Sequence, residues 1–199
     1  EPVDVGEAHG FGTAGGPGAA TGDYPRRPVR GRWQALLDGD AQRDRRRPGS
    51  EEERGDQHRA EQRELPYLGA LTPPEAWALL NDDESAVLID VRTDAEMDWV
   101  GYVSFSPDRS FHIEWNDYPD GVRNPDFMAQ VAARVEPHQT ILFLCRSGAR
   151  SHHAAVLAAK NGYGKAINVL EGFEGDKDDS HRRSSINGWR FHGLPWEQH

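Results

Sequence analysis

Apolar residues are unevenly distributed along the chain. Beyond Trp33, Leu36 and Leu37, residues 1–64 show no sustained apolar period; they are rich in Gly, Ala and Pro and then in Arg, Asp, Glu and Gln. Such a segment buries too little apolar surface to offset the entropy lost on ordering. We therefore expect residues 1–64 to be a disordered or loosely ordered extension, and residues 65–199 to form the folded domain.

Within residues 65–199, continuous aliphatic and β-branched runs alternate with segments of helical character. The runs 86–91, 140–145 and 166–170 are typical of strands covered on both faces, after a first short apolar run at 68–71. Alternation of strands and helices predicts an α/β fold with a central, mainly parallel sheet. Its active site is expected at the carboxyl ends of the strands, where the chain turns into helices.

Local signals mark the helices between these strands. Thr72-Pro73-Pro74-Glu75 combines an N-cap, a proline in the first turn and a capping-box Glu, so a helix should run to about Leu80. Asn124-Pro125-Asp126 predicts a second helix, ended by Pro137. We expect its core-facing residues to be Phe127, Met128, Val131, Ala132 and Val135. A third helix, residues 151–160, should stop at Asn161-Gly162.

Composition excludes several classes of function. The formal net charge of -10 argues against a nucleic-acid binder, because phosphate backbones are held by surplus Lys and Arg. The sequence has one cysteine, which rules out a disulfide within the chain, and it lacks an apolar run long enough to span a membrane. The chain begins at Glu1 and not at Met, so a removed leader stays open.

The single cysteine ends a predicted buried strand and is followed by Arg146-Ser147-Gly148-Ala149-Arg150. Gly148 can adopt backbone angles closed to other residues, so the loop can curl and aim its N–H groups inward at a helix N-terminus. This positive end and the two arginines favour a thiolate. The sequence therefore predicts that Cys145 is a nucleophile and not a small buried hydrophobe.

These features resemble the rhodanese family. The resemblance rests on the Cys145–Arg150 loop, Asp90-Val91-Arg92, Glu96, Gly101, Leu170-Glu171-Gly172, Trp189, Gly193 and Pro195. It implies a three-layer fold and a sulfurtransferase that moves sulfur from a donor such as thiosulfate to cyanide or a thiol, through a persulfide on Cys145. Residues 146–150 would bind the donor, and Arg146 and Arg150 would hold its anion. No metal or organic cofactor is implied.

Alternative functions are separated by the loop itself. Phosphatases and arsenate reductases of similar fold place five residues between Cys and Arg, whereas four residues separate Cys145 from Arg150 here. A docking module without activity would be expected to lack the cysteine. A sulfur carrier whose donor and acceptor are proteins stays open, beside small-molecule sulfur transfer. The reactive thiol suits reducing cytoplasm.

Other residues have supporting roles in this hypothesis. Asp90 and Arg92 are expected to fix neighbouring loops, with Arg92 and Glu96 as an ion pair. His152 and His153 are adjacent and so point in different directions along a helix, which argues against a metal site. Phe173 is the best candidate for the rim of the site, while most of Trp115, Trp189 and Trp196 should pack the core.

Two segments lack a clear counterpart in the family pattern. After Gly101 the chain runs through Ser104–Ser110 without the His and the Ile-Pro-Gly-Ala turn that the family usually shows, so this segment is expected to fold differently. The Glu171–Gly188 segment is long and charged. We expect it to form a lid or a loop that docks a partner.

Overall fold

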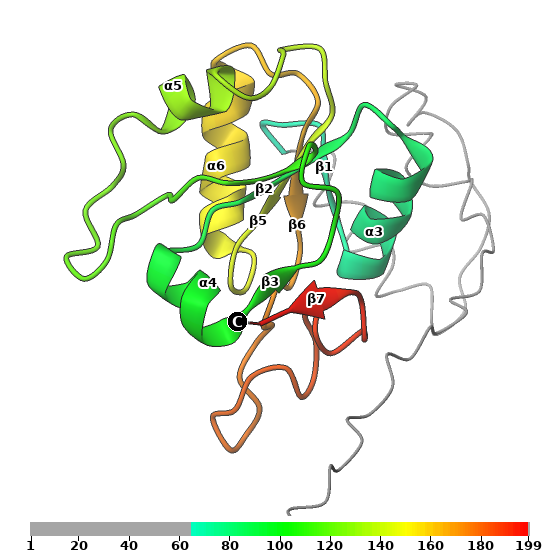
Figure 1. Ribbon diagram of the computed structural model, residues 1–199, viewed down its shortest axis with the longest axis vertical. Coiled ribbons are helices and arrows are strands. Elements are labelled where there is room, and N and C mark those ends of the chain that lie inside the picture. Colours follow the sequence, from blue (N-terminus) through cyan, green and yellow to red (C-terminus); the bar gives the residue numbers. More distant parts are fainter. Residues whose placement is uncertain (1–64, 199) are drawn as a thin grey trace, which may run out of the picture.

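A parallel sheet forms the centre of the computed structural model, which describes residues 65–198 (Figure 1). The extension predicted for residues 1–64 lies outside the described residues. The sheet has five strands in the order β1-β6-β5-β2-β4, and every neighbouring pair is parallel. The strands are β1 (Gly69–Leu71), β2 (Val87–Asp90), β4 (Ser110–His112), β5 (Ile141–Leu144) and β6 (Ala166–Val169).

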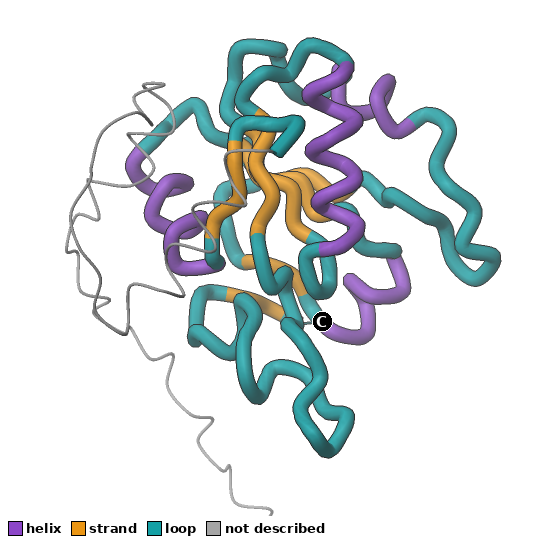
Figure 2. The backbone as a smooth tube through the Cα atoms, turned by 180° about the vertical axis from the view of Figure 1, so that it is seen from behind, coloured by secondary structure: helices purple, strands orange, loops and turns teal. Residues whose placement is uncertain are grey.

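Successive side chains of the central strands enter two separate cores. In β5, Ile141 and Phe143 pack with one cluster and Leu142 and Leu144 with the other, as the two-residue period of a strand requires. Helices α5 (Phe127–Ala132) and α6 (Ala149–Lys160) cover the first face, and α3 (Pro73–Asp82) covers the second (Figures 1 and 2). The three-layer α/β fold with a mainly parallel sheet is confirmed.

The predicted start of α3 is also confirmed in detail. The backbone N–H of Thr72 donates to the Glu75 carboxylate at 2.9 Å, and both halves of the capping box are present. Within residues 65–198, no helix is long and apolar enough to cross a membrane.

Helix α5 is shorter than predicted, because it ends at Ala132 and not near Pro137. Phe127, Val131 and Val135 are buried as expected, since they follow each other at intervals of four residues. The prediction for Ala132 was wrong: its neighbour Val131 occupies the core-facing position, and Ala132 is turned toward solvent. Val135 reaches the core from a turn, in which its N–H donates to the Val131 carbonyl at 3.0 Å.

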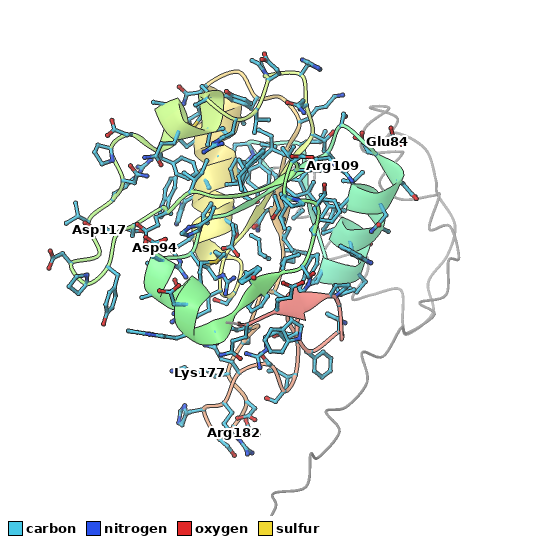
Figure 3. All side chains as sticks on the ribbon, in the orientation of Figure 1. Glu84, Asp94, Arg109, Asp117, Lys177 and Arg182 are labelled. Atoms are coloured by element: carbon cyan, nitrogen blue, oxygen red, sulfur yellow. The ribbon has the colours of Figure 1, made fainter. Side chains whose placement is uncertain are left out.

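Below the carboxyl edge of the sheet lie α4 (Asp94–Val100) and a ribbon of two antiparallel strands, β3 (Tyr102–Val103) and β7 (Trp196–Glu197) (Figure 1). The segment Ser104–Ser110 leads from β3 to the edge strand β4. Arg109 anchors it near the end of α3 (Figure 3) by donating to the carbonyls of Leu80 and Asp83, each at 3.1 Å. The Arg109 guanidinium also lies 4.7 Å from the Phe105 ring centroid.

Candidate active site

The sequence motifs meet at the carboxyl edge of the sheet. Asp90–Arg92 lie at the end of β2, Cys145–Arg150 follow β5, and Leu170–Gly172 follow β6. Strands β2, β5 and β6 are adjacent and parallel, so their carboxyl ends lie side by side. The structure thus brings together three segments that are far apart in the sequence.

The thiol of Cys145 is held by two hydrogen-bond donors at the base of the loop. The backbone N–H of Gly148 donates to its Sγ at 3.1 Å, and the Ser151 hydroxyl donates at 3.2 Å. Cys145 is 1% exposed and Ser151 is fully buried. Both donors stabilise negative charge on sulfur. Ser151 was not among the predicted site residues; its place in the first turn of a helix six residues after the cysteine was the available signal.

The loop curls at Gly148, as predicted from the sequence. Gly148 is the N-cap of α6 and has φ 93°, in the left-handed region. The carbonyl of Cys145 accepts the Phe173 N–H at 2.7 Å, and the carbonyl of Arg146 accepts the Glu174 N–H at 2.9 Å. The loop carbonyls therefore face the segment after β6, away from the helix N-terminus.

With the carbonyls engaged there, the loop N–H groups form a cradle for an anion. Within residues 65–198, the backbone N–H groups of Arg146, Ser147, Ala149 and Arg150 have no acceptor. They lie at the N-terminus of α6, where the helix dipole adds positive potential. Two hollows of about 400 and 420 Å³ flank β4, but the residues that line them do not include this loop.

The two arginines of the loop differ in their surroundings. Arg150 is tied to Glu96 of α4: its Nη1 donates to Oε2 at 2.7 Å and its Nη2 to Oε1 at 2.6 Å. Arg146 is exposed. Within the described part of the chain, the Arg146 side chain contacts no acceptor, and none contacts the Ser147 hydroxyl. Of the two loop arginines, Arg146 is thus the one whose guanidinium is free to meet an incoming anion.

The Glu96–Arg150 ion pair shifts the pKa of both of its members. Burial works to raise the pKa of Glu96, but the hydrogen bonds from Arg150 and the Thr93 N–H, with the charges of Arg150 and Arg92, bring it down to about 2. Burial likewise works to lower the pKa of Arg150, but Glu96 outweighs it, and the charges of Cys145 and Asp90 add to the rise. Both members stay charged at neutral pH.

Arg92 pairs with Asp90, and the predicted ion pair between Arg92 and Glu96 was wrong. The Arg92 Nη2 donates to the Asp90 carboxylate at 2.7 Å and to the Gly101 carbonyl at 2.9 Å. Asp90 lies two residues before Arg92 at the end of the same strand, and its carboxylate accepts the Arg92 Nε. The Glu96 carboxylate accepts from Arg150 instead. The fully buried Arg92 therefore ties the end of β2 to the end of α4.

Phe173 does not line the rim of the site. It is 0% exposed, and the Arg92 guanidinium lies over its ring, 4.0 Å from the centroid. Trp115 and Trp189 are buried in the core as expected, and Trp196 is half-buried. Phe173 was expected at the surface because it follows a strand end, but it packs inward beneath the cysteine loop.

The adjacent histidines of α6 make separate packing contacts. His152 Nδ1 lies 2.8 Å from the Tyr67 hydroxyl, and the His153 ring stacks on Trp115. Burial and the neighbouring His153 lower the pKa of His152. Across residues 65–198, no group of three or more His, Cys, Asp or Glu side chains is arranged to hold a metal ion.

The long Glu171–Gly188 segment has two parts. Residues 172–175 pack on the cysteine loop through the backbone bonds described above. Beyond them Lys177 and Arg182 lie on the loop that projects away from the sheet (Figure 3). The Asp178 carboxylate closes this loop by accepting the N–H groups of Ser180 and Arg182, at 2.8 and 2.9 Å. A role as a lid or docking loop stays a prediction.

Comparison with known proteins places this arrangement in a family. Residues 72–179 match the family model described as Rhodanese-like domain. The chain belongs to the rhodanese-like family. The crystal structure of Rv0390 from M. tuberculosis shares its fold, with 40% identity and a TM-score of 0.61, over 67% of this chain and 99% of that one.

Two curated relatives each match more than half of the chain. An uncharacterized protein of Rickettsia conorii is 33% identical over 124 residues, which are 62% of this chain and 92% of the relative. A protein of Allochromatium vinosum, named a sulfurtransferase, is 27% identical over 117 residues, or 58% of this chain and 82% of the relative.

Proposed function

We propose that the protein is a sulfurtransferase in which Cys145 takes up a sulfur atom as a persulfide and passes it to a thiophilic acceptor. The observation that carries this proposal is the Gly148 N–H that donates to the Cys145 sulfur, beside the cradle of unpartnered loop N–H groups at the N-terminus of α6. Membership of the rhodanese-like family supports the same chemistry.

In the first step the Cys145 thiolate attacks the outer sulfur of a donor such as thiosulfate. A bond forms between the two sulfur atoms, the bond within the donor breaks, and sulfite leaves with the bonding electron pair. The exposed Arg146 side chain and the N–H groups of residues 146–150 would stabilise the negative charge and orient the donor. The product is a persulfide on Cys145.

In the second step a thiophilic acceptor attacks the outer sulfur of the persulfide and regenerates the Cys145 thiolate. With cyanide the product is thiocyanate. Because the two half-reactions are separate, double-displacement kinetics are expected. Both steps conserve atoms and electrons among the donor, Cys145 and the acceptor, so the proposal invokes no metal or organic cofactor.

Neighbouring residues would keep the nucleophile in place. Ser151 donates its hydroxyl to the sulfur through both half-reactions. Asp90 and Arg92 do not contact Cys145; in this proposal they are positioning residues, because Arg92 supports Phe173, whose N–H holds the Cys145 carbonyl. Ser147 faces the cradle with its N–H, and its hydroxyl is available to a donor.

The direct test uses intact-mass spectrometry. After incubation with thiosulfate, the protein should gain the mass of one sulfur atom, and cyanide should remove it as thiocyanate. The variant Cys145→Ser should gain nothing. An unchanged mass of the wild type, or an equal gain in Cys145→Ser, would refute the proposal.

The acceptor is proposed to be a small thiol or a protein thiol, and the compartment to be reducing, such as the cytoplasm. The persulfide-loaded protein can be incubated with cyanide, with a small thiol and with a reduced protein thiol. The relative rates of sulfur loss, read from the same mass spectra, would rank these acceptor classes.

A further inference from the structure

The Glu96 carboxylate is held by partners from two different helices. Glu96 is the third residue of α4, and its Oε2 accepts the Thr93 N–H at 2.9 Å in a capping box. The same carboxylate accepts both terminal nitrogens of Arg150, across 54 residues of sequence. The cap of one helix thus holds the cation at the start of another.

This contact changes the charge that a donor meets. Arg150 would add a positive charge beside the cradle, but the Glu96 carboxylate lies against its guanidinium and offsets that charge. The pair is only partly exposed, with 23% of the Arg150 side chain and 18% of the Glu96 side chain accessible, so solvent screens it incompletely. Arg146 is left as the free cation of the loop.

We propose that Glu96 is a specificity-determining residue. It fixes the Arg150 side chain, offsets its positive charge, and so disfavours donors that carry two negative charges. Sulfur donors with a single negative charge lose less electrostatic attraction when the Arg150 charge is offset, so the site is matched to monoanions. The inference rests on the proposed sulfur transfer for its substrate class. In this proposal Arg146 carries the uncompensated positive charge that meets the donor, while the charge of Arg150 is offset by Glu96.

The charge effect can be measured without any sulfur transfer. Cys145 is the one cysteine of the sequence, so its alkylation rates by neutral iodoacetamide and by anionic iodoacetate report the potential at the cradle. Glu96→Gln keeps the shape of the side chain and frees one positive charge. We expect the iodoacetate-to-iodoacetamide rate ratio to rise about 5-fold, from Coulomb attraction at short range in a partly screened site.

Sulfur uptake provides the second readout. Thiosulfate is a dianion, whereas methanethiosulfonate is a monoanion that transfers the same outer sulfur and leaves as methanesulfinate. Glu96→Gln should lower the KM for thiosulfate more than that for methanethiosulfonate, and the ratio of their kcat/KM values should shift about 5-fold toward thiosulfate.

Asp98→Asn is the matched control. It removes the same charge from the same helix, at an exposed residue that does not contact Arg150. Neither ratio should change in this variant. Arg146→Gln should lower the alkylation ratio about 5-fold, because it removes the free cation from an exposed position. Thermal unfolding of each variant checks that it is folded.

The outcomes separate the two proposals. If Glu96→Gln leaves both ratios unchanged, or if it raises the KM of both donors equally, the specificity role is wrong. A folded Arg146→Gln with an unchanged alkylation ratio overturns it as well, even where Glu96→Gln does not fold. If the alkylation ratios move as expected but neither donor loads sulfur, the charge role stands and the sulfurtransferase proposal fails.

Discussion

Gly172 is the point at which the segment after β6 crosses the cysteine loop. A methyl group there would lie 2.5 Å from the carbonyl carbon of Arg146 and from the backbone nitrogen of Ser147, and still nearer the carbonyl oxygen of Cys145. All of these are backbone atoms, which no change of rotamer can move. Gly172→Ala must therefore displace either the loop or the segment.

The cost has two parts. Gly172 has φ 65°, so any side chain carries about 1–2 kcal/mol of left-handed strain. Forcing a methyl group into closely packed atoms adds about 1–3 kcal/mol. We expect Gly172→Ala to lower the free energy of unfolding by about 2–5 kcal/mol.

Guanidinium unfolding measures this loss, and intact-mass spectrometry with thiosulfate measures the effect on sulfur uptake, which should slow at least about 10-fold because the cradle is displaced. Gly121→Ala is the matched control, since Gly121 has φ 68° but no atom within 4 Å of an added methyl group. It should show the strain of about 1–2 kcal/mol alone. If the two variants lose equal stability, the reasoning about the crossing is refuted.

Three further predictions concern the rest of the domain. Ser151→Ala removes a donor to the sulfur of Cys145, so sulfur uptake followed by mass should slow about 10-fold. Because the pKa of Glu96 is depressed from 4.5 to about 2, its pairing stabilises the fold above pH 4.5. About 2–3 kcal/mol should be lost, in urea unfolding, as pH falls from 4.5 toward 2. A chain that starts at Leu65 should fold and take up sulfur, as circular dichroism and mass spectra would show.

A specific result would contradict each of these three predictions. Ser180→Ala changes an exposed hydroxyl on the projecting loop and should leave uptake unchanged; an equal loss in both serine variants would remove the special role of Ser151. Glu96→Gln should lose less stability than the wild type over the same acidic range, and parallel pH curves would contradict the assignment to Glu96. An unfolded chain from Leu65 would disprove the predicted domain boundary.

The elements that were predictable are those with a local cause. The cap at Thr72 and the aliphatic strands carry their signals within a few adjacent residues. The cysteine loop could also be recognised locally, because Gly148 and the following helix mark its turn. The Phe173 and Glu174 N–H groups that hold its carbonyls come from a distant segment and had no such local signal. The strand ends then meet at one edge, as any parallel sheet requires.

The errors concern choices between distant partners. Arg92 had two carboxylates within reach in the sequence, and the direction of each side chain selected Asp90 for Arg92 and Glu96 for Arg150. The position of Phe173 after a strand end is compatible with a side chain that faces water or the core. Its inward orientation goes with the contact to the buried Arg92, whose guanidinium lies over the ring. Such choices depend on three-dimensional packing, which no spacing rule encodes.

The pairing of β1 with β6 has a consequence for synthesis on the ribosome. Gly69 lies opposite Ile167, so the first strand of the sheet has no partner until the last parallel strand has emerged. Phe173 and Glu174, which hold the carbonyls of the cysteine loop, follow later still. We expect a nascent chain to expose Cys145 before its cradle exists, so that competence to carry sulfur arises only when translation of the domain is almost complete.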